Sequence, residues 1–265
     1  MRRLHRPGDT PVHRLPPQCK LLAVLGFALA VVSTPREAFW AFAGHAVLLG
    51  LVAAAARVPP PFVVRRMAVE TPFVLFAVLL PVVGRGPYTE LWGVELSVEG
   101  LWAGWNILAK ASLGVAASIL LAATTEPRAL LLGARRLRLP ALLVQIATFM
   151  LRYADVVLGE MRRMRIARES RGFAARDVRH LPVVAKSAGA LFIRSYERGE
   201  RVHLAMLSRG YDGVMPALYD PPASARQWAV AAALPGAACA VALAAWIEVS
   251  GIGVPGMGVS GMGAG

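Results

Sequence analysis

The sequence predicts an all-α fold, that of a polytopic membrane protein with about five transmembrane helices and a basic helical region on the cytoplasmic side. Two observations carry this prediction. First, 56% of the 265 residues are hydrophobic, only 17% are charged, and the mean hydropathy is +0.53, whereas soluble domains carry about a quarter charged residues. Second, the basic residues gather in some of the segments between the uncharged runs and are scarce in others. This composition excludes a disordered chain, a collagen and a coiled coil.

Five nearly uncharged runs are predicted to cross the membrane. A bilayer core is crossed by about 20 apolar residues, and the second, fourth and fifth runs meet this requirement. The first and third are shorter, so we expect Lys20 and Arg85 to extend toward the interface while the bilayer thins locally. The predicted spans are 21–35, 38–56, 71–84 and 100–125, which form a four-span part at 21–125, and 227–247, which lies in a last helix at 226–249.

The distribution of Lys and Arg predicts the orientation. Residues 1–20 contain five Lys and Arg, several prolines and no cleavage site, so we interpret them as a retained cytoplasmic leader. Residues 124–209 contain 17 basic and 7 acidic residues, whereas the loops at 36–37 and 85–99 have no positive excess. Because Lys and Arg stay on the cytoplasmic side, the N-terminus and the region 126–215 are predicted to face inward. The last helix then leaves a flexible tail, 250–265, outside.

A net charge of +13 and a pI near 11.1 are also typical of nucleic-acid-binding proteins. Here the basic excess follows the predicted topology, and no motif of a DNA- or RNA-binding fold accompanies it. We therefore predict contact with the lipid bilayer and with protein, and no nucleic acid. The two cysteines, Cys19 and Cys239, are too few for a disulfide framework or a zinc site.

The basic region contains three predicted helices and an internal repeat. The helices are expected to start at Pro127, Pro140 and Pro182, because proline is favoured in a first turn, and the last two should end near 171 and 209. At an offset of 38 residues these two ends align as Ala-x-x-Ser-Arg-Gly followed by an aromatic residue. The first copy is Ala167, Ser170, Arg171, Gly172 and Phe173, and the second is Ala205, Ser208, Arg209, Gly210 and Tyr211.

Two explanations of the repeated ends are compatible with the residues. Arginine in a last turn favours the helix dipole and glycine ends a helix in the left-handed conformation, so capping alone explains either copy. Capping does not explain why serine, alanine and the aromatic residue recur as well. Since arginine and aromatic residues are frequent interface anchors, we interpret the two ends as docking elements for acidic grooves on a partner that comes as a pair.

At these residues the chain resembles the transmembrane (T) components of energy-coupling factor (ECF) transporters, most closely the cobalt/nickel-type CbiQ subfamily. The resemblance covers nearly the whole chain and includes 10–15, 20–22, 124–127, 139–140, 151–153 and 162–164. In that family the paired tripeptides are typically Ala-Arg-Gly, and serine replaces alanine in both copies here. The resemblance implies a subunit of the bacterial cell membrane whose two helix ends dock on two cytoplasmic ABC-type ATPase subunits. It also implies that other helices hold a separate substrate-binding (S) subunit, for uptake of cobalt or nickel.

The chain itself is predicted to be a non-catalytic subunit without a cofactor. Its sequence has no Gly-x-x-x-x-Gly-Lys-Ser/Thr loop to bind nucleotide phosphates, so ATP hydrolysis is expected in the partner subunits. No triad, nucleophile elbow or paired-carboxylate metal motif is visible. Three alternatives stay open: a T component shared by vitamin-binding subunits, a secondary transporter, which should have repeated membrane halves, and a membrane-embedded lipid-modifying enzyme.

Lys110 and Asn106 are polar residues one turn apart within a predicted span. Intramembrane charge is costly and usually faces protein or water. A role in gating is compatible with the sequence, and so is a structural role in which Lys110 binds a carbonyl group or a carboxylate such as Glu70 or Glu248. The five histidines lack the spacing of a metal site, and we predict no metal ligands.

Overall fold

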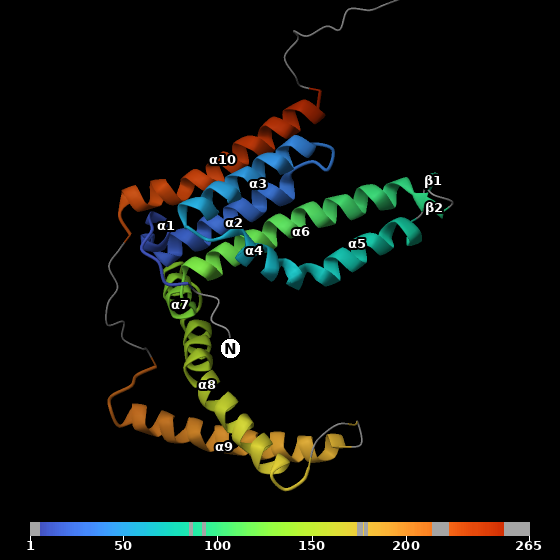
Figure 1. Cartoon of the computed structure of the whole chain (residues 1–265). Coiled ribbons are helices and arrows are strands. Elements are labelled where there is room, and N and C mark those ends of the chain that lie inside the picture. Colours follow the sequence, from blue (N-terminus) through green and yellow to red (C-terminus); the bar gives the residue numbers. More distant parts are fainter. Residues whose placement is uncertain are drawn as a thin grey trace, which may run out of the picture. The chain divides into compact units, whose positions relative to one another are not determined.

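The structure is a computed structural model that describes residues 6–84, 87–91, 94–173, 177, 180–213 and 223–251. It confirms the all-α fold class, to which one short β-hairpin is added (Figure 1). In chain order the elements are α1 (Pro11–Arg14), α2 (Pro17–Ser33), α3 (Phe39–Ala55), α4 (Pro60–Arg66), the 3₁₀ helix η1 (Met67–Glu70), α5 (Thr71–Val83), β1 (Tyr88–Leu91), β2 (Val94–Ser97), α6 (Val98–Thr124), α7 (Pro127–Arg136), α8 (Ala141–Glu169), α9 (Leu181–Leu207) and α10 (Ala225–Val249).

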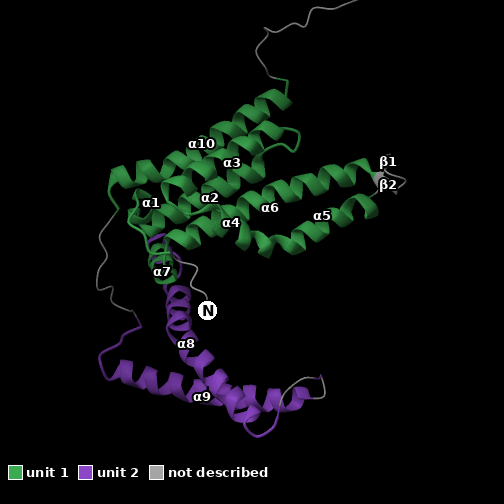
Figure 2. Ribbon diagram, in the orientation of Figure 1, with its two compact units in different colours: residues 1–133, 223–265 green, residues 134–222 purple. Residues whose placement is uncertain are grey.

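The chain divides into two compact units (Figure 2). The first, here called the membrane unit, comprises Met1–Gly133 and Ala223–Gly265 and therefore joins α10 to the N-terminal helices. The second, here called the arm unit, comprises Ala134–Pro222 and holds α8 and α9. The division separates the apolar helices α2 to α6 and α10 from the charged segment that carries the internal repeat.

The core of the membrane unit lies between α2, α3, α6 and α10. Helix α10 packs against α2 and α3, and α6 packs against α2, α3 and α5 (Figure 1). The large side chains of this core include Phe27, Phe42 and Leu113, which pack among small alanines. On the outer faces, Leu29 and Leu51 are 63% and 62% exposed. A unit with an apolar surface of this kind is solvated by lipid rather than by water.

Among the described residues, four helices are long and apolar enough to cross a membrane: Pro60–Val83, Val98–Thr124, Ala141–Glu169 and Ala225–Val249. Helices α2 and α3 are apolar but shorter, at 17 residues each. These helices confirm a multi-pass membrane protein. The third predicted span, 71–84, is longer than expected, because the helix begins at Pro60 and continues through α4 and η1. Arg65 and Arg66, which lie between the predicted spans 38–56 and 71–84, are therefore helical. Their helix, α4, has prolines in its first turn.

The run 139–151, predicted as a buried or interfacial helix, supplies the first half of α8. Leu142 and Met150 are each 67% exposed, and Val144 is the buried residue of this helix. Most side chains of this run are thus exposed within the arm unit.

A short hairpin was not predicted, and parts of the predicted tail and leader lie outside the described residues. The loop between the third and fourth spans contains the antiparallel pair β1 and β2, in which Tyr88 faces Ser97 and Leu91 faces Val94. The predicted tail 250–265 lies outside the described residues apart from Ser250 and Gly251, and so do residues 1–5 of the predicted leader.

Candidate functional site

Helix α8 ends in a Schellman motif centred on Gly172. The φ angle of Gly172 is +74°, which is the left-handed region that favours glycine. The amide of Phe173 donates to the carbonyl oxygen of Arg168 at 3.1 Å, and the amide of Gly172 donates to that of Glu169 at 3.0 Å. These are the two hydrogen bonds that define the motif. The helix therefore ends at a fixed place and in a fixed direction.

Helix α9 ends in the same way. Gly210 has a φ angle of +80°, the amide of Tyr211 donates to the carbonyl oxygen of Met206 at 3.0 Å, and the amide of Gly210 donates to that of Leu207 at 3.0 Å. The serine hydroxyls match too, since Ser170 donates to the Ala167 carbonyl at 3.1 Å and Ser208 to the Ala205 carbonyl at 3.0 Å. The two copies of the sequence repeat thus have the same backbone conformation and the same hydrogen bonds.

The arginines of both ends are presented to solvent. Arg171 and Arg209 are exposed, and no ion pair or hydrogen bond joins either guanidinium group to another residue in the described part of the chain. Arg165, on the same helix as Arg171, instead binds Glu169 at 2.8 Å. Since an unpaired guanidinium has five donors in a rigid plane, each end offers a carboxylate-binding group that the chain does not itself use.

The aromatic residues of the two ends are half-buried and pack back onto the arm unit. Phe173 meets the ring of His180 edge to face, with 5.1 Å between ring centroids. The Tyr211 hydroxyl accepts a hydrogen bond from the Gln145 side-chain amide on α8. The sequence predicted both aromatics as interface residues, and the structure adds that each one holds its helix end in place.

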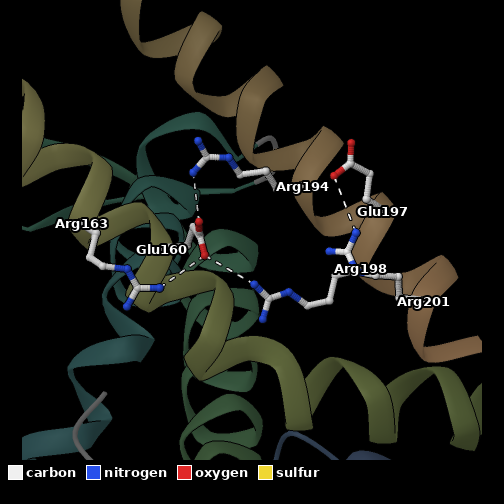
Figure 3. A network of polar contacts seen from close by, with 6 residues as sticks. All are labelled: Glu160, Arg163, Arg194, Glu197, Arg198 and Arg201. Carbon is white, nitrogen blue, oxygen red and sulfur yellow. Dashed lines mark hydrogen bonds and ion pairs between the residues drawn. The ribbon is translucent and has the colours of Figure 1, made fainter. Parts of the chain in front are cut away.

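Sequence reasoning missed the polar links between α8 and α9. Glu160 of α8 binds Arg194 and Arg198 of α9 as well as Arg163 of its own helix (Figure 3). Arg168 also donates to the Ser187 hydroxyl at 2.9 Å. No local spacing rule pairs Glu160 with residues more than 30 positions away, so these contacts were not predicted from the sequence. Within α9, Glu197 and Arg201 form an ion pair one helical turn apart, at 3.9 Å.

A cavity of about 490 Å³ lies between α8 and α9. Its lining is mainly apolar and aromatic, with a few polar groups. The residues that line it include Phe149, Tyr153, Arg198, His203 and Tyr211. The two helices thus enclose space instead of packing tightly along their length.

In the membrane unit, Lys110 binds a main-chain carbonyl group. Its ammonium group donates to the carbonyl oxygen of Val32 at 2.7 Å. The two carboxylates named as possible partners have other contacts, because Glu70 accepts from Ser112 at 2.5 Å and Glu248 accepts from Trp40 at 2.7 Å. Asn106 has a buried Oδ1 atom without a hydrogen-bond partner. The geometry gives Lys110 a structural contact, and a role in gating stays a prediction.

Histidine, cysteine and acidic side chains do not converge on a metal-binding group within the described residues. The buried His45 instead shares a hydrogen bond with the Thr34 hydroxyl at 3.0 Å, and His13 shares one with that of Thr10 at 2.7 Å. At the ends of α8 and α9, the described residues offer exposed guanidinium groups, which can bind carboxylates.

Comparison with known proteins identifies the family. Residues 8–218 match the family model CbiQ, described as cobalt transport protein. The chain is 29% identical over 230 residues to the energy-coupling factor transporter transmembrane protein EcfT of Heliobacterium modesticaldum, which covers 78% of this chain and 82% of that protein. It is 29% identical over 206 residues to the cobalt transport protein CbiQ of Rhodobacter capsulatus, which covers 77% and 82%.

A third relative, an uncharacterised protein of Methanocaldococcus jannaschii, is 34% identical over 130 residues. In that case the match spans only about half of each protein, 47% of this chain and 47% of the relative. The family match, by contrast, extends from the leader through the membrane helices to the end of the arm unit. The chain belongs to the CbiQ family and is a transmembrane component of an energy-coupling factor transporter.

Proposed function

We propose that this chain is the non-catalytic coupling subunit of an ECF-type importer, which links a pair of cytoplasmic ABC-type ATPases to a substrate-binding membrane subunit. The observation that carries the proposal is the matched pair of helix ends, each with an exposed and unpaired arginine on the same Schellman framework. Because the same docking surface occurs at both helix ends, it suits a partner that is present in two copies. The docking residues are Ser170, Arg171 and Gly172 on one end and Ser208, Arg209 and Gly210 on the other.

The absence of a phosphate-binding loop from the sequence supports the division of labour. Without the Gly-Lys-Ser/Thr element this chain has no site of its own for the phosphates of ATP. If the two ATPases approach each other when they bind ATP, the docked helices move with them and strain the membrane unit. That motion would open and close the substrate-binding subunit.

We place the N-terminus, residues 1–20, and the coupling helices, residues 126–215, in the cytoplasm. The two ends of the membrane unit support this orientation. At one end, the indole of Trp40 donates to Glu248 at 2.7 Å and the indole of Trp246 donates to the Ser33 carbonyl at 2.6 Å, as is typical of a membrane interface. At the opposite end of α3 stands Arg57, which belongs to the positive, inward side.

The proposed cargo is the cobalt ion, or nickel. The description of the matching family, cobalt transport protein, supports this cargo. The relatives named for energy-coupling factor transport in general support a second candidate, a T component shared by vitamin-binding subunits. The residues that select the substrate are expected in the S subunit, so uptake by the complete complex must decide between the two.

The docking role is tested by the double variant Arg171→Ala/Arg209→Ala. We expect the amount of ATPase that co-purifies with the chain to fall on the order of tenfold or more, because buried interface arginines are frequent hot spots. The matched control is Arg165→Ala/Arg201→Ala, which removes the same charge from the two helices but leaves Arg171 and Arg209 in place. Unchanged ATPase co-purification and unchanged cobalt(II) uptake in the first variant would refute the docking role.

A further inference from the structure

Glu160 is the meeting point of the two helices that carry the docking ends. One carboxylate oxygen, Oε1, accepts a hydrogen bond from Arg194 at 3.1 Å. The other, Oε2, accepts one from Arg163 at 3.3 Å and lies 3.6 Å from the guanidinium of Arg198 (Figure 3). Arg194 and Arg198 are one helical turn apart on α9, so both reach the same carboxylate. The Glu160 side chain is only 18% exposed, although its partners are charged and partly exposed.

The position of this contact follows the internal repeat. Glu160 stands eleven positions before Arg171, and Arg198 stands eleven positions before Arg209, so the offset of 38 residues that relates the two ends also relates Glu160 to Arg198. The contact therefore joins corresponding points of the two copies. At 1.5 Å per residue, each arginine lies about 16 Å along its helix from the contact. The segment of α8 from Glu160 to Arg171 and the segment of α9 from Arg198 to Arg209 are here called the two arms. They are thus equal in length.

The polar links run along the two helices in antiparallel order. Gln145 of α8 binds Tyr211 just beyond α9, Glu160 binds the middle of α9, and Arg168 binds Ser187 near its start. Because α8 and α9 run in opposite directions past Glu160, their docking ends lie on opposite sides of it. A rotation about Glu160 would therefore move both ends at once.

Apolar packing contributes little to the relative orientation of α8 and α9. Among the described residues α9 has no buried residue, and Val144 is the buried residue of α8. The cavity of about 490 Å³ between them removes further contact area. Single exposed ion pairs stabilise a structure only slightly, but the Glu160 carboxylate, whose side chain is 18% exposed, is shared by three arginines and forms a network. The charged cluster is thus the main element that sets the arm geometry.

We propose that Glu160 is the pivot of the coupling unit: its ion pairs with Arg194 and Arg198 hold the two arms at one relative orientation and pass the displacement of one docked end to the other. Glu160 is a positioning residue, since it is not itself part of either docking end. The role of Glu160 in coupling rests on the proposed function, whereas its ion pairs involve residues of this chain alone.

The first experiment measures the distance between the arms without any partner. Spin labels are attached at Ala167→Cys and Ala205→Cys in the full chain, with Cys19 and Cys239 replaced by alanine, in nanodiscs of phosphatidylethanolamine and phosphatidylglycerol. We expect Glu160→Gln to broaden the distance distribution about twofold, since the arms then sample more orientations. The matched control, Glu197→Gln, removes a carboxylate that pairs with Arg201 inside α9 and should leave the distribution unchanged. A Glu160→Gln distribution as narrow as that of the parent protein would overturn the pivot.

The second experiment uses the complete transporter complex. With the ATPases still bound, Glu160→Gln should lower cobalt(II) uptake per ATP hydrolysed about fivefold, a size typical of changes in coupling. The charge exchange Glu160→Arg/Arg163→Glu/Arg194→Glu/Arg198→Glu, which reverses the sign of every member of the cluster, should restore both the narrow distance distribution and the uptake ratio, which a loss of folding would not allow. Unchanged uptake per ATP in Glu160→Gln, or no rescue by the exchange, would overturn the proposal.

The two experiments separate this proposal from the proposed function. If Arg171→Ala/Arg209→Ala leaves the ATPases bound while Glu160→Gln broadens the arm distances, the docking role fails and the pivot remains. If docking is lost in the arginine variant and Glu160→Gln changes neither measurement, the docking role stands and the pivot fails.

Discussion

Lys20 and Lys110 lie on two neighbouring helices of the membrane unit, and each binds the carboxyl-terminal end of the other's helix. Lys20 of α2 donates to the carbonyl oxygen of Thr124, the last residue of α6, at 3.0 Å. Lys110 of α6 donates to the carbonyl oxygen of Val32 in the last turn of α2, at 2.7 Å. The last carbonyl groups of a helix lack partners within it and carry partial negative charge. The two lysines therefore join α2 and α6 at two separate points.

Lys20→Met is expected to destabilise the membrane unit by about 1 to 3 kcal/mol, the cost of buried acceptors left without a donor. Lys20 is only 6% exposed and also binds the His13 carbonyl at 3.1 Å and the Thr125 hydroxyl at 3.2 Å. The measurement is the midpoint of thermal unfolding in detergent. Lys186→Met, at an exposed site on α9, should leave the midpoint unchanged. If both variants unfold at the same temperature as the parent protein, the hydrogen bonds of Lys20 contribute nothing to stability.

Lys110→Met is expected to cost less, about 1 kcal/mol, because the contact with Val32 is partly exposed and a single helix-end cation contributes at that level. Since Lys110 and Thr124, the partner of Lys20, are about four helical turns apart on α6, the effects of the two variants should add to within about 0.5 kcal/mol in the double variant. The same thermal midpoints test this. A transport defect in Lys110→Met without any loss of stability would instead favour the gating role.

The lysine contacts show what a sequence can predict. The cost of a charge within a span indicated that Lys110 needs a partner, and carbonyl groups were among the candidates. The Val32 oxygen itself could not be named, because it depends on how α2 and α6 pair, and every residue has a carbonyl. Lys20 was expected to reach the interface from a short span, whereas in the structure it is buried against Thr124 and Thr125. Tertiary packing, not local pattern, decides such contacts.

The helix ends were more predictable than the contacts between helices. A Ser-Arg-Gly end is local, and its glycine requires only the backbone preference of one residue, so Gly172 and Gly210 were assigned to their left-handed caps from sequence. The link from Glu160 to Arg194 depends on the loop that returns the chain and was invisible. Helix α5 begins at Thr71, as predicted, but the helical segment from Pro60 that leads into it was missed, since Arg65 and Arg66 follow an apolar run without ending the helix.

Gly172→Ala and Gly210→Ala are each expected to destabilise the corresponding helix end by about 1 to 2 kcal/mol, because a Cβ atom disfavours the left-handed conformation. Hydrogen exchange of the amides of Phe173 and Tyr211, which close the two motifs, should become faster. The control is Gly189→Ala in the interior of α9, where an added Cβ meets nothing within 4 Å and alanine favours the helix. Slower or unchanged exchange at the ends would contradict the assigned caps.

Gly104→Val should separate α5 from α6. These two helices approach so closely that an added Cβ atom on Gly104 would lie 2.7 Å from the carbonyl oxygen of Ala77, and one on Gly100 would lie 2.5 Å from that of Leu80. Small residues permit such contact between helix backbones in membranes, and a rigid carbonyl group cannot move aside as a side chain can.

The expected cost of Gly104→Val is about 1 to 3 kcal/mol, the usual penalty of overpacking, measured by the thermal midpoint in detergent. Gly114→Val is the matched control, since it lies on the same helix and an added Cβ atom there meets nothing within 4 Å. Both substitutions replace a helical glycine of α6 by valine and so change helix propensity by the same amount, and the difference between their midpoints isolates the α5–α6 contact. Equal midpoints would mean that α5 is held to the rest of the membrane unit by something other than this glycine contact. A lower midpoint for Gly104→Val alone would show that the close approach of α5 to α6 contributes to stability.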